Sequence, residues 1–297
     1  MHISGVEIID TFAEAFDMWG ARLIVTAASQ KWARIAGENA TGFATSVIAC
    51  GAEAGIEGPV PAVETPDGRP GVSLLVFTMG PKGMKKQLMG RVGQSIMTCA
   101  TTACFDGLQE GEKTVEVGGN LRYFGDGYQI SKLLEGRRLW RIPVMEGEFV
   151  VDETFYIQRS VGGGNFLILG EDPGVTLEAA EKAVEAIANV AGVIAPFPGG
   201  IVRSGSKTSS KYSFLRASTN SPYCPMLRGQ VETALPENVN SVLEVVIDGL
   251  SEEAIAQATA AGIRAACRPG IVRITAGNYG GTLGRHQFHL HDVLDQW

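Results

Sequence analysis

One carboxylate, Glu244, stands in an apolar stretch of the sequence and is the residue best placed to move a proton. Residues 241–248 are strand-like and, between Ser241 and Asp248, apolar on both alternating faces apart from Glu244, which Val242 and Val246 flank on its own face. A carboxyl buried in such a setting has its charged form disfavoured, so its pKa rises toward the range of a general acid or base. The competing interpretation is a glutamate at a sheet edge that reaches water or pairs with an arginine.

Two glycine-rich stretches resemble nucleotide sites without matching them. Residues 200–208 come close to a P-loop, but Ser206 is inserted before Lys207 and shifts the register of the lysine. We interpret residues 203–211 as a loop rich in hydroxyls, amides and cations, which is either solvated or anion-binding. The three glycines at 162–164 lie between two strand-like runs, so a tight hairpin is expected there instead of a dinucleotide site.

Metal and nucleophile motifs are weak. His289 and His291 alternate on a strand-like run, a spacing that metal sites can use, but no second histidine cluster or suitably spaced carboxylate accompanies them. A structural or intersubunit role is therefore favoured for these histidines. The sequence has no G-x-S-x-G motif for a serine hydrolase, and Cys224 is interpreted as a buried thiol because no neighbouring residue would lower its pKa.

Length and composition narrow the class of protein. A chain of 297 residues, 45% hydrophobic and 19% charged, is globular and predicts two domains or lobes. A net charge of -7 with scattered Lys and Arg argues against a nucleic-acid partner. Because no apolar stretch is long enough to span a membrane and the N-terminus lacks a signal-peptide pattern, a cytoplasmic protein without membrane contact is expected. The five cysteines include no C-x-x-C pair and are expected to be reduced.

Helices and strands alternate in a similar order in both halves. In the first half, strands are expected at 22–27, 45–50, 72–77 and 121–124, and helices after Ser29 and at 85–97. In the second half, strands are expected at 165–169, 192–196, 241–248, 271–275 and 287–291, and helices after Thr176 and Ser251. This order predicts an α+β fold with mixed or antiparallel sheets covered by helices. We place the boundary near Met145, which gives lobes at 1–145 and 146–297.

Nearly the whole sequence resembles formylmethanofuran:tetrahydromethanopterin formyltransferase. The matching segments are residues 10–16, 40–43, 64–71, 124–129, 146–149, 195–202, 217–220, 276–281 and 289–292. The resemblance implies two similar ferredoxin-like α/β lobes. It also implies transfer of a formyl group between the amine of a methanofuran-type carrier and N5 of tetrahydromethanopterin. No permanently bound cofactor or metal is implied, because formylmethanofuran and tetrahydromethanopterin act as co-substrates.

The resemblance also assigns roles to residues. The family's proposed catalytic glutamate, in a strand that reads E-I-V-I-N-G-L, falls on Glu244 in this sequence. We expect Glu244 to carry the proton that the departing amine gains and the attacking nitrogen loses. The backbone amides of Gly199 and Gly200, or the side chain of Asn278, are expected to stabilise the tetrahedral oxyanion.

Further residues are expected to bind the substrates, each with a turn-forming or solvated role as the alternative. Those suited to stacking on a pterin or furan ring and to hydrogen bonding with it are Phe124, Asp126 and Tyr128. Those suited to an acidic carrier tail are Arg203, Lys207 and Lys211. Phe197 is assigned to substrate binding as well.

Departures from the archaeal pattern at residues 79–86 and 285–288, with the modest net charge, indicate the bacterial methylotroph branch of the family. There the family protein resembles a subunit of a formyltransferase/hydrolase complex that acts in formaldehyde oxidation. The resemblance implies a homotetramer built as a dimer of dimers. The alternative function is a non-catalytic structural subunit that binds carrier and pterin for a partner hydrolase.

Overall fold

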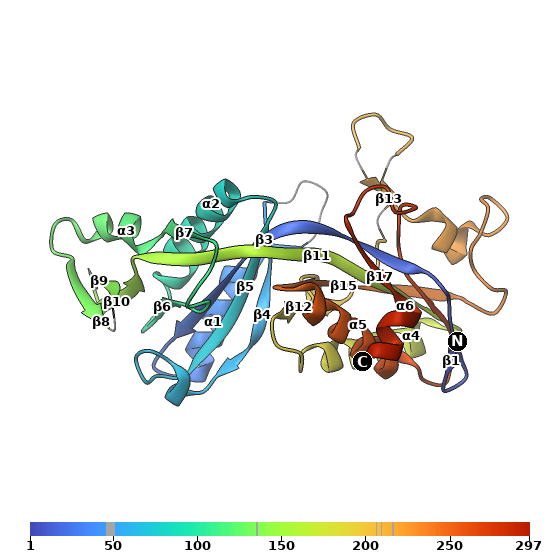
Figure 1. Ribbon diagram of the computed structural model, residues 1–297, viewed down its shortest axis with the longest axis horizontal. Helices are drawn as coiled ribbons and strands as arrows, with labels where there is room; N and C mark the ends of the chain where they lie inside the picture. The colour runs from blue at the N-terminus through green and yellow to red at the C-terminus, as the bar shows by residue number, and fades with distance from the viewer. Residues whose placement is uncertain (46–50, 135, 206, 209, 216) are drawn as a thin grey trace. The chain divides into compact units, whose positions relative to one another are not determined.

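The computed structural model describes the chain except for residues 46–50, 135, 206, 209 and 216 (Figure 1). The strand expected at 45–50 therefore lies, apart from Thr45, outside the described residues. The chain forms two compact units. The first contains Met1–Asp17 and Val161–Trp297, and the second contains Met18–Thr45 and residues 51–160.

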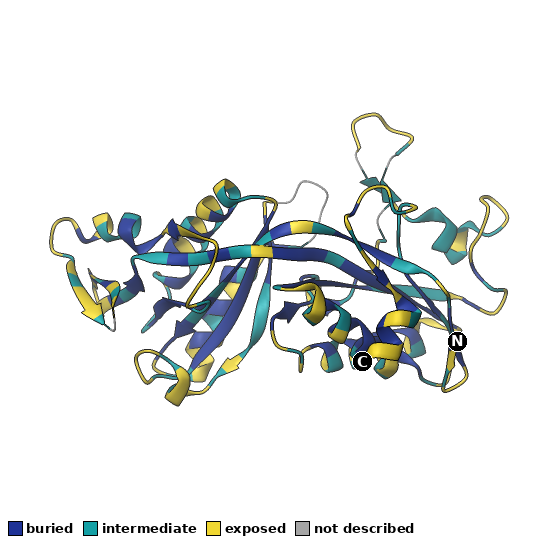
Figure 2. Cartoon of the chain, in the orientation of Figure 1, coloured by how far each residue is buried: buried dark blue, intermediate teal, exposed yellow. Residues whose placement is uncertain are grey.

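The core of the second unit is a β-α-β-β-α-β motif. Its elements are β3 (Phe12–Thr26), α1 (Gln30–Thr41), β4 (Glu53–Val60), β5 (Gly71–Thr78), α2 (Pro81–Arg91) and β6 (Ala103–Asp106). The strands pair antiparallel in the order β6-β3-β5-β4. Every residue of β5 is buried, as the uninterrupted apolar run of its sequence predicts (Figure 2).

The core of the first unit repeats this motif. Its elements are β11 (Thr154–Gly170), α4 (Pro173–Ile187), β12 (Val193–Ile194), β15 (Ser241–Gly249), α5 (Glu252–Ala266) and β16 (Ile271–Thr275). The order is β16-β11-β15-β12, again antiparallel, so each strand holds the same place as its counterpart in the second unit. This is the split β-α-β arrangement of ferredoxin-like folds. The predicted α+β fold with two similar ferredoxin-like motifs is confirmed.

Additional elements extend both units. In the first unit they are β1 (His2–Ile3), β2 (Val6–Ile8), β13 (Lys207–Thr208), β14 (Ala217–Ser218), β17 (His286–His289) and α6 (Leu290–Gln296). In the second they are β7 (Lys113–Glu116), α3 (Gly118–Leu121), β8 (Ile130–Leu134), β9 (Arg137–Val144) and β10 (Gly147–Asp152). Because β2 joins β16 in parallel and β10 joins β6 in parallel, the sheets are mixed.

Each unit has its own apolar core. In the first unit, α4, α5 and α6 cover one face of the sheet (Figure 1), and their apolar side chains form one cluster with Phe166, Val245 and Ile247. On the opposite face, a smaller cluster joins Leu167 and Leu169 of β11 to Leu235 and Val239 of the long segment before β15. The two sides of this sheet therefore differ, and the second side carries the polar groups described below.

Three local predictions were wrong. Residues 121–124, expected as a strand, form consecutive helical turns. The glycines at 162–164 make a bulge inside the single long strand β11, not a hairpin, because β11 pairs with β15 on both sides of them. Gly163 takes a φ of +90° there and lies against the ring of Phe16. Helix α4 begins after Asp172, whose side chain accepts the amides of Gly174 and Val175, and not after Thr176.

Candidate active site

Glu244 lies in the interior of the first unit's sheet. It sits on β15 opposite Leu167 of β11, and on its other side its backbone is paired with that of Val202. Alternation along β15 places its side chain on the face opposite the helices, together with Val242, which packs beside the Leu167 cluster. The sheet-edge interpretation of Glu244 therefore does not apply.

The surroundings of Glu244 shift its protonation. Burial raises the pKa of its carboxyl from an ordinary 4.5 to about 7. Burial is the single cause of this shift, and among the described residues no arginine or lysine forms an ion pair with the carboxylate. A carboxyl that titrates near neutrality can both give and accept a proton under cellular conditions.

A glycine-rich loop, residues 277–284, is attached to the same face of the sheet. Asn165 of β11, opposite Val246, holds the start of the loop: its side-chain oxygen accepts the amide of Gly277 at 2.6 Å, and its nitrogen donates to the Gly277 carbonyl at 3.1 Å. Asn165 and Glu244 are thus near neighbours on one face. The loop carries two polar side chains, Asn278 and Tyr279, toward this region.

Asn278 and Tyr279 are in different situations. The side-chain nitrogen of Asn278 donates to the hydroxyl of Thr11 at 3.2 Å and to the carbonyl of Phe12 at 3.0 Å, which engages both of its hydrogens. The phenol of Tyr279 is half-buried, and its pKa is raised by burial and by the nearby charges of Glu244 and Glu14. The Tyr279 phenol therefore keeps its hydrogen and lies close enough to Glu244 for the charge of that carboxylate to act on it, whereas the Asn278 amide holds the loop in place.

The other expected oxyanion donors lie in the turn Pro198–Gly200. Gly199 and Gly200 both have positive φ, at 64° and 77°, so glycine suits both positions. The amide of Gly200 donates to the carbonyl of Phe197 at 2.7 Å. This turn leads directly into Val202, the backbone partner of Glu244.

Phe197 and Arg203 border an apolar cavity of about 540 Å³. Its other walls include Leu177 of α4 and Leu243 of β15. Because Leu243 and Glu244 are consecutive strand residues, their side chains leave opposite faces of the sheet. The cavity therefore lies on the helix-covered side, while the Glu244 carboxyl faces the other side.

The other two basic residues expected to bind substrate, Lys207 and Lys211, lie on a long excursion of the chain between the turn Pro198–Gly200 and β15. Lys207, in the short hairpin of β13 and β14, donates to the hydroxyl of Ser221 at 3.3 Å, and Lys211 is exposed. Cys224 is half-buried, and its thiol donates to the carbonyl of Asn220 at 3.4 Å. The assignment of the two lysines to an acidic substrate tail stays a prediction.

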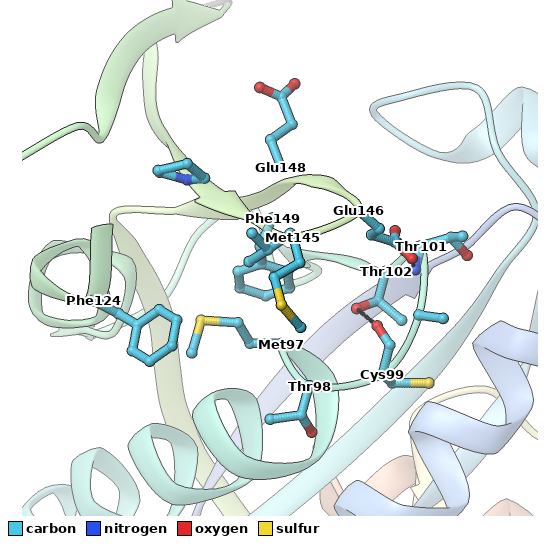
Figure 3. A pocket seen from close by; sticks show the side chains of 13 residues that line it. Met97, Thr98, Cys99, Thr101, Thr102, Phe124, Met145, Glu146, Glu148 and Phe149 are labelled. Carbon is cyan, nitrogen blue, oxygen red and sulfur yellow. Dashed lines mark hydrogen bonds between the residues drawn. The ribbon is translucent and has the colours of Figure 1, made fainter. Parts of the chain in front are cut away.

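The second unit contains the other expected ring-binding residues. Phe124 lines a cavity of about 810 Å³ with Met97, Met145 and Phe149, and Figure 3 shows its ring beside Met97. Asp126 and Tyr128 are exposed in the following turn. A ring-lined apolar cavity of this size suits an aromatic ligand, although only Phe124 of the three residues lines it.

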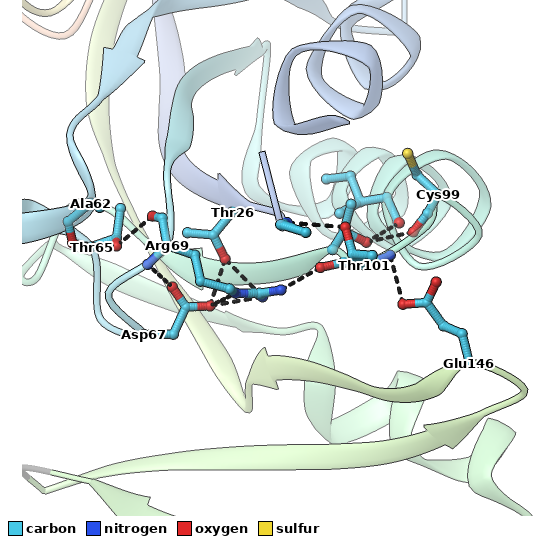
Figure 4. A network of polar contacts seen from close by, with 11 residues as sticks. Thr26, Ala62, Thr65, Asp67, Arg69, Cys99, Thr101 and Glu146 are labelled. Carbon is cyan, nitrogen blue, oxygen red and sulfur yellow. Dashed lines mark hydrogen bonds and ion pairs between the residues drawn. The ribbon is translucent and has the colours of Figure 1, made fainter. Parts of the chain in front are cut away.

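A polar network stiffens one wall of this cavity (Figure 4). Thr101 has a φ of 65°, which is rare for a β-branched residue. Its amide donates to Glu146 at 2.7 Å, and its carbonyl accepts from the guanidinium of Arg69. Arg69 is in turn bound to Asp67 at 2.8 Å, so residues from distant parts of the sequence fix this wall.

His286 and His291 contact carboxylates, a backbone carbonyl and the N-terminal amine. The ring of His286 lies 2.9 Å from the carboxylate of Asp17 and 3.0 Å from that of Glu252. The ring of His291 contacts the backbone carbonyl of Ile8 and the N-terminal amine. Among the described residues, no group of three His, Cys, Asp or Glu side chains is arranged to hold a metal ion. Within the same part of the chain, no helix has the length and apolarity that a membrane crossing requires.

Glu14 was missed at the sequence level, although a signal was present. It is a lone carboxylate between Ala13 and Ala15 in β3, the same kind of exception that drew attention to Glu244. Its side chain is 1% exposed and accepts four backbone amides from the 277–284 loop. Tyr279 and Asn165 were missed as well, because their neighbours come from distant parts of the chain.

The duplicated ferredoxin-like motif and an internal carboxyl whose pKa burial raises to about 7 suit an α+β enzyme that uses acid–base catalysis. Two family profiles match the chain: formylmethanofuran-tetrahydromethanopterin formyltransferase over residues 1–144, and the proximal lobe of the same family over residues 147–293. The chain therefore belongs to the formylmethanofuran-tetrahydromethanopterin formyltransferase family, and it is a formyltransferase.

Individual relatives match the sequence of this chain over nearly its whole length. The formylmethanofuran–tetrahydromethanopterin formyltransferase of Methylococcus capsulatus is 57% identical, with 99% of this chain and 100% of the relative covered. The enzyme of the same name from Methanopyrus kandleri is 54% identical, with the same coverage. Among solved structures, the formyltransferase/hydrolase complex of Methylorubrum extorquens with methylofuran contains a chain of TM-score 0.96 and 52% identity, with 99% and 98% covered.

Proposed function

We propose that this formyltransferase moves a formyl group between the amine of a methanofuran-type carrier and N5 of tetrahydromethanopterin, with Glu244 as the proton shuttle. The observation that carries the proposal is the burial-raised pKa of Glu244, about 7, on an interior strand of a member of this family. The relatives act on these two substrates by name. The reaction belongs to one-carbon metabolism and serves formaldehyde oxidation.

The chemistry requires one proton to change places. N5 attacks the formyl carbon, a tetrahedral oxyanion forms, and the bond between that carbon and the carrier nitrogen breaks. N5 loses a proton, and the carrier nitrogen gains one and leaves as the amine. Glu244, protonated at the start, gives its proton to the carrier nitrogen and takes the one that N5 loses, so that it ends unchanged.

The decisive experiment uses the purified chain alone. Wild-type protein is mixed with formylated carrier and tetrahydromethanopterin, and formyl-pterin and free formate are both measured. We expect formyl-pterin to appear without free formate, and Glu244→Gln to lose most of kcat while still binding both substrates. Glu237→Gln, the same change at an exposed glutamate of the same unit, is the matched control and should keep full activity.

Other outcomes identify the rival functions. Binding of both substrates without transfer by the wild-type chain would indicate a non-catalytic subunit that serves a partner hydrolase. Release of formate in the absence of pterin would indicate a hydrolase. Full activity of Glu244→Gln would remove the proton shuttle while leaving the transfer itself intact.

The assembly and the remaining requirements form a second part of the proposal. We propose a cytoplasmic homotetramer that can join a larger formyltransferase/hydrolase complex and that needs no permanently bound cofactor. The relative from Methylorubrum extorquens, which is 52% identical and is named as one component of such a complex, supports the larger assembly. Sedimentation of the purified chain tests the tetramer, and activity after extensive chelation and dialysis tests the cofactor requirement.

A further inference from the structure

Glu14 holds the 277–284 loop in an unusual way. One oxygen of its carboxylate accepts the amides of Tyr279 at 2.6 Å and Gly281 at 3.1 Å. The other accepts those of Leu283 at 2.5 Å and Gly284 at 2.6 Å. Four donors match the four lone-pair positions of an ionised carboxylate, so the loop is wrapped around this one side chain.

The charge of Glu14 is essential to this arrangement. Burial raises the pKa of its carboxyl, but the four backbone amides lower it by more, so the pKa lies below its ordinary value. Glu14 therefore remains ionised at neutral pH. A neutral side chain at this position would leave some of the amides without an acceptor, which is costly in a buried setting.

The loop that Glu14 fixes lies over the face that carries Glu244. Asn165 binds Gly277 at the start of the loop, and its strand neighbour Leu167 is directly opposite Glu244. Tyr279 follows two residues after Gly277, and its amide is one of the four bound by Glu14. The loop is therefore anchored at its start by Asn165 and from Tyr279 to its end by Glu14.

We propose that Glu14 is a positioning residue for formyl transfer: by binding the loop amides it holds Tyr279 beside Glu244, where the phenol donates a hydrogen bond to the formyl oxygen as the oxyanion forms. The inference rests on the proposed function and adds to it the donor for the oxyanion. A phenol is suited to this task because its hydrogen is directional and stays in place below its raised pKa. The Asn278 amide, which is engaged with Thr11 and Phe12, is less suited to it.

A double-mutant cycle tests the path from Glu14 through Tyr279. Tyr279→Phe removes the donor and should lower kcat on the order of 10²-fold with little change in KM. Glu14→Gln keeps the length of the side chain but offers one acceptor oxygen in place of two, and it should lower kcat by a similar factor. If Glu14 acts through Tyr279, the double variant should be no slower than the slower single variant.

Hydrogen exchange gives a readout on the loop itself. In the wild type, the amides of residues 279–284 should be protected, and in Glu14→Gln they should exchange faster. Ser251→Ala is the stability control, because it removes the cap of α5, where Ser251 accepts the amide of Ala254 at 3.2 Å, without touching the loop. This control should lose stability and keep kcat.

Each result decides the inference separately from the proposed function. Multiplicative losses in the double variant, or unchanged kcat in either single variant, would overturn the inference while formyl transfer by the wild type stands. If Glu14→Gln does not fold, Gly281→Ala replaces it: this change strains the loop at a φ of 73° and leaves the carboxylate in place. Its loss of kcat should also disappear in the Tyr279→Phe background. Absence of transfer by the wild type would instead refute the function itself.

Discussion

Glu244 and Val202 exchange a pair of backbone hydrogen bonds: the amide of Val202 donates to Glu244 at 2.8 Å, and the amide of Glu244 donates to Val202 at 2.9 Å. With β11 on its other side, the backbone of Glu244 is fixed between two neighbours. The side chain cannot move to water by fraying of a strand edge. The strand pairing fixes the position of its carboxyl on the sheet face, and burial there raises the pKa.

The pKa of Glu244 predicts the same dependence on Glu244 protonation for both directions of the reaction. Transfer from the carrier to the pterin needs the protonated carboxyl, so kcat/KM should fall as the pH rises through about 7. Because Glu244 ends the transfer protonated, the reverse direction starts from the same protonated carboxyl, and its kcat/KM should fall over the same range. Initial rates from about pH 5.5 to 8.5 in both directions test this.

The matched comparison for these profiles is Glu244→Gln. Because the carrier amine also titrates, only the part of each profile that the glutamine variant lacks belongs to Glu244. We expect kcat to fall about 10²- to 10⁴-fold in the variant. Profiles that keep the same inflection near neutrality in Glu244→Gln would assign it to another group.

The same shift predicts that Glu244 costs stability. Its folded pKa lies above its unfolded value of 4.5, so its ionisation opposes folding as the pH rises through about 7. Glu244→Gln should therefore be more stable than the wild type at about pH 8.5, by about 2 kcal/mol once partial solvent contact is allowed for, and equal to it below about pH 4.5. Urea unfolding at both pH values measures the difference. Equal stability of the two proteins at high pH would contradict the buried setting.

Local patterns were sufficient to predict much of this structure. The apolar run at 72–77 became the fully buried β5, and Ser251 caps α5 as expected. Glu244 was found because one charge interrupted a strand pattern. Each of these features depends on residues that are close in the sequence, where periodicity and capping preferences carry the information.

Features that depend on distant pairing were not predictable. Glu14 and the amides that it binds are more than 260 residues apart, so no local pattern connects them. The bulge at 162–164 has the same cause: three glycines favour a turn locally, but pairing with β15 on both sides of the bulge keeps β11 continuous. Strand pairing overrode the local preference at these positions.

Because the carboxylate of Asp152 is buried, removing its partner Arg137 should lower the stability of the protein by an amount that depends on pH. Arg137 pairs with Asp152, which is buried, and burial still raises the pKa of that carboxyl. Arg137→Ala should cost about 2–3 kcal/mol at about pH 8, because it leaves a charge without its partner. The cost should shrink as the pH falls, because the raised pKa lets Asp152 take up a proton and lose its charge. Arg138→Ala, which removes an exposed pair with Glu153, should cost less than about 1 kcal/mol across the same pH range.

The turn before Val202 predicts different costs for two adjacent glycines. Gly199 and Gly200 both have positive φ, but a Cβ at Gly199 would meet nothing within 4 Å, whereas one at Gly200 would lie 2.7 Å from Val184 of α4. Gly199→Ala should cost about 1 kcal/mol from backbone strain alone. Gly200→Ala should cost a further 1–3 kcal/mol, roughly, because the turn or the helix must shift. Urea unfolding of both variants measures the two costs.

The same turn connects packing to the site, since it sets the position of Val202 and so of the backbone bonded to Glu244. Gly200→Ala should therefore lower kcat more than Gly199→Ala does. Adding Val184→Ala to Gly200→Ala makes room for the new methyl group. The double variant should therefore be more stable and faster than the sum of the two single effects predicts. If Val184→Ala brings no recovery, contact with α4 is not what requires glycine at position 200. The strain of its φ of 77° would then account for the whole effect.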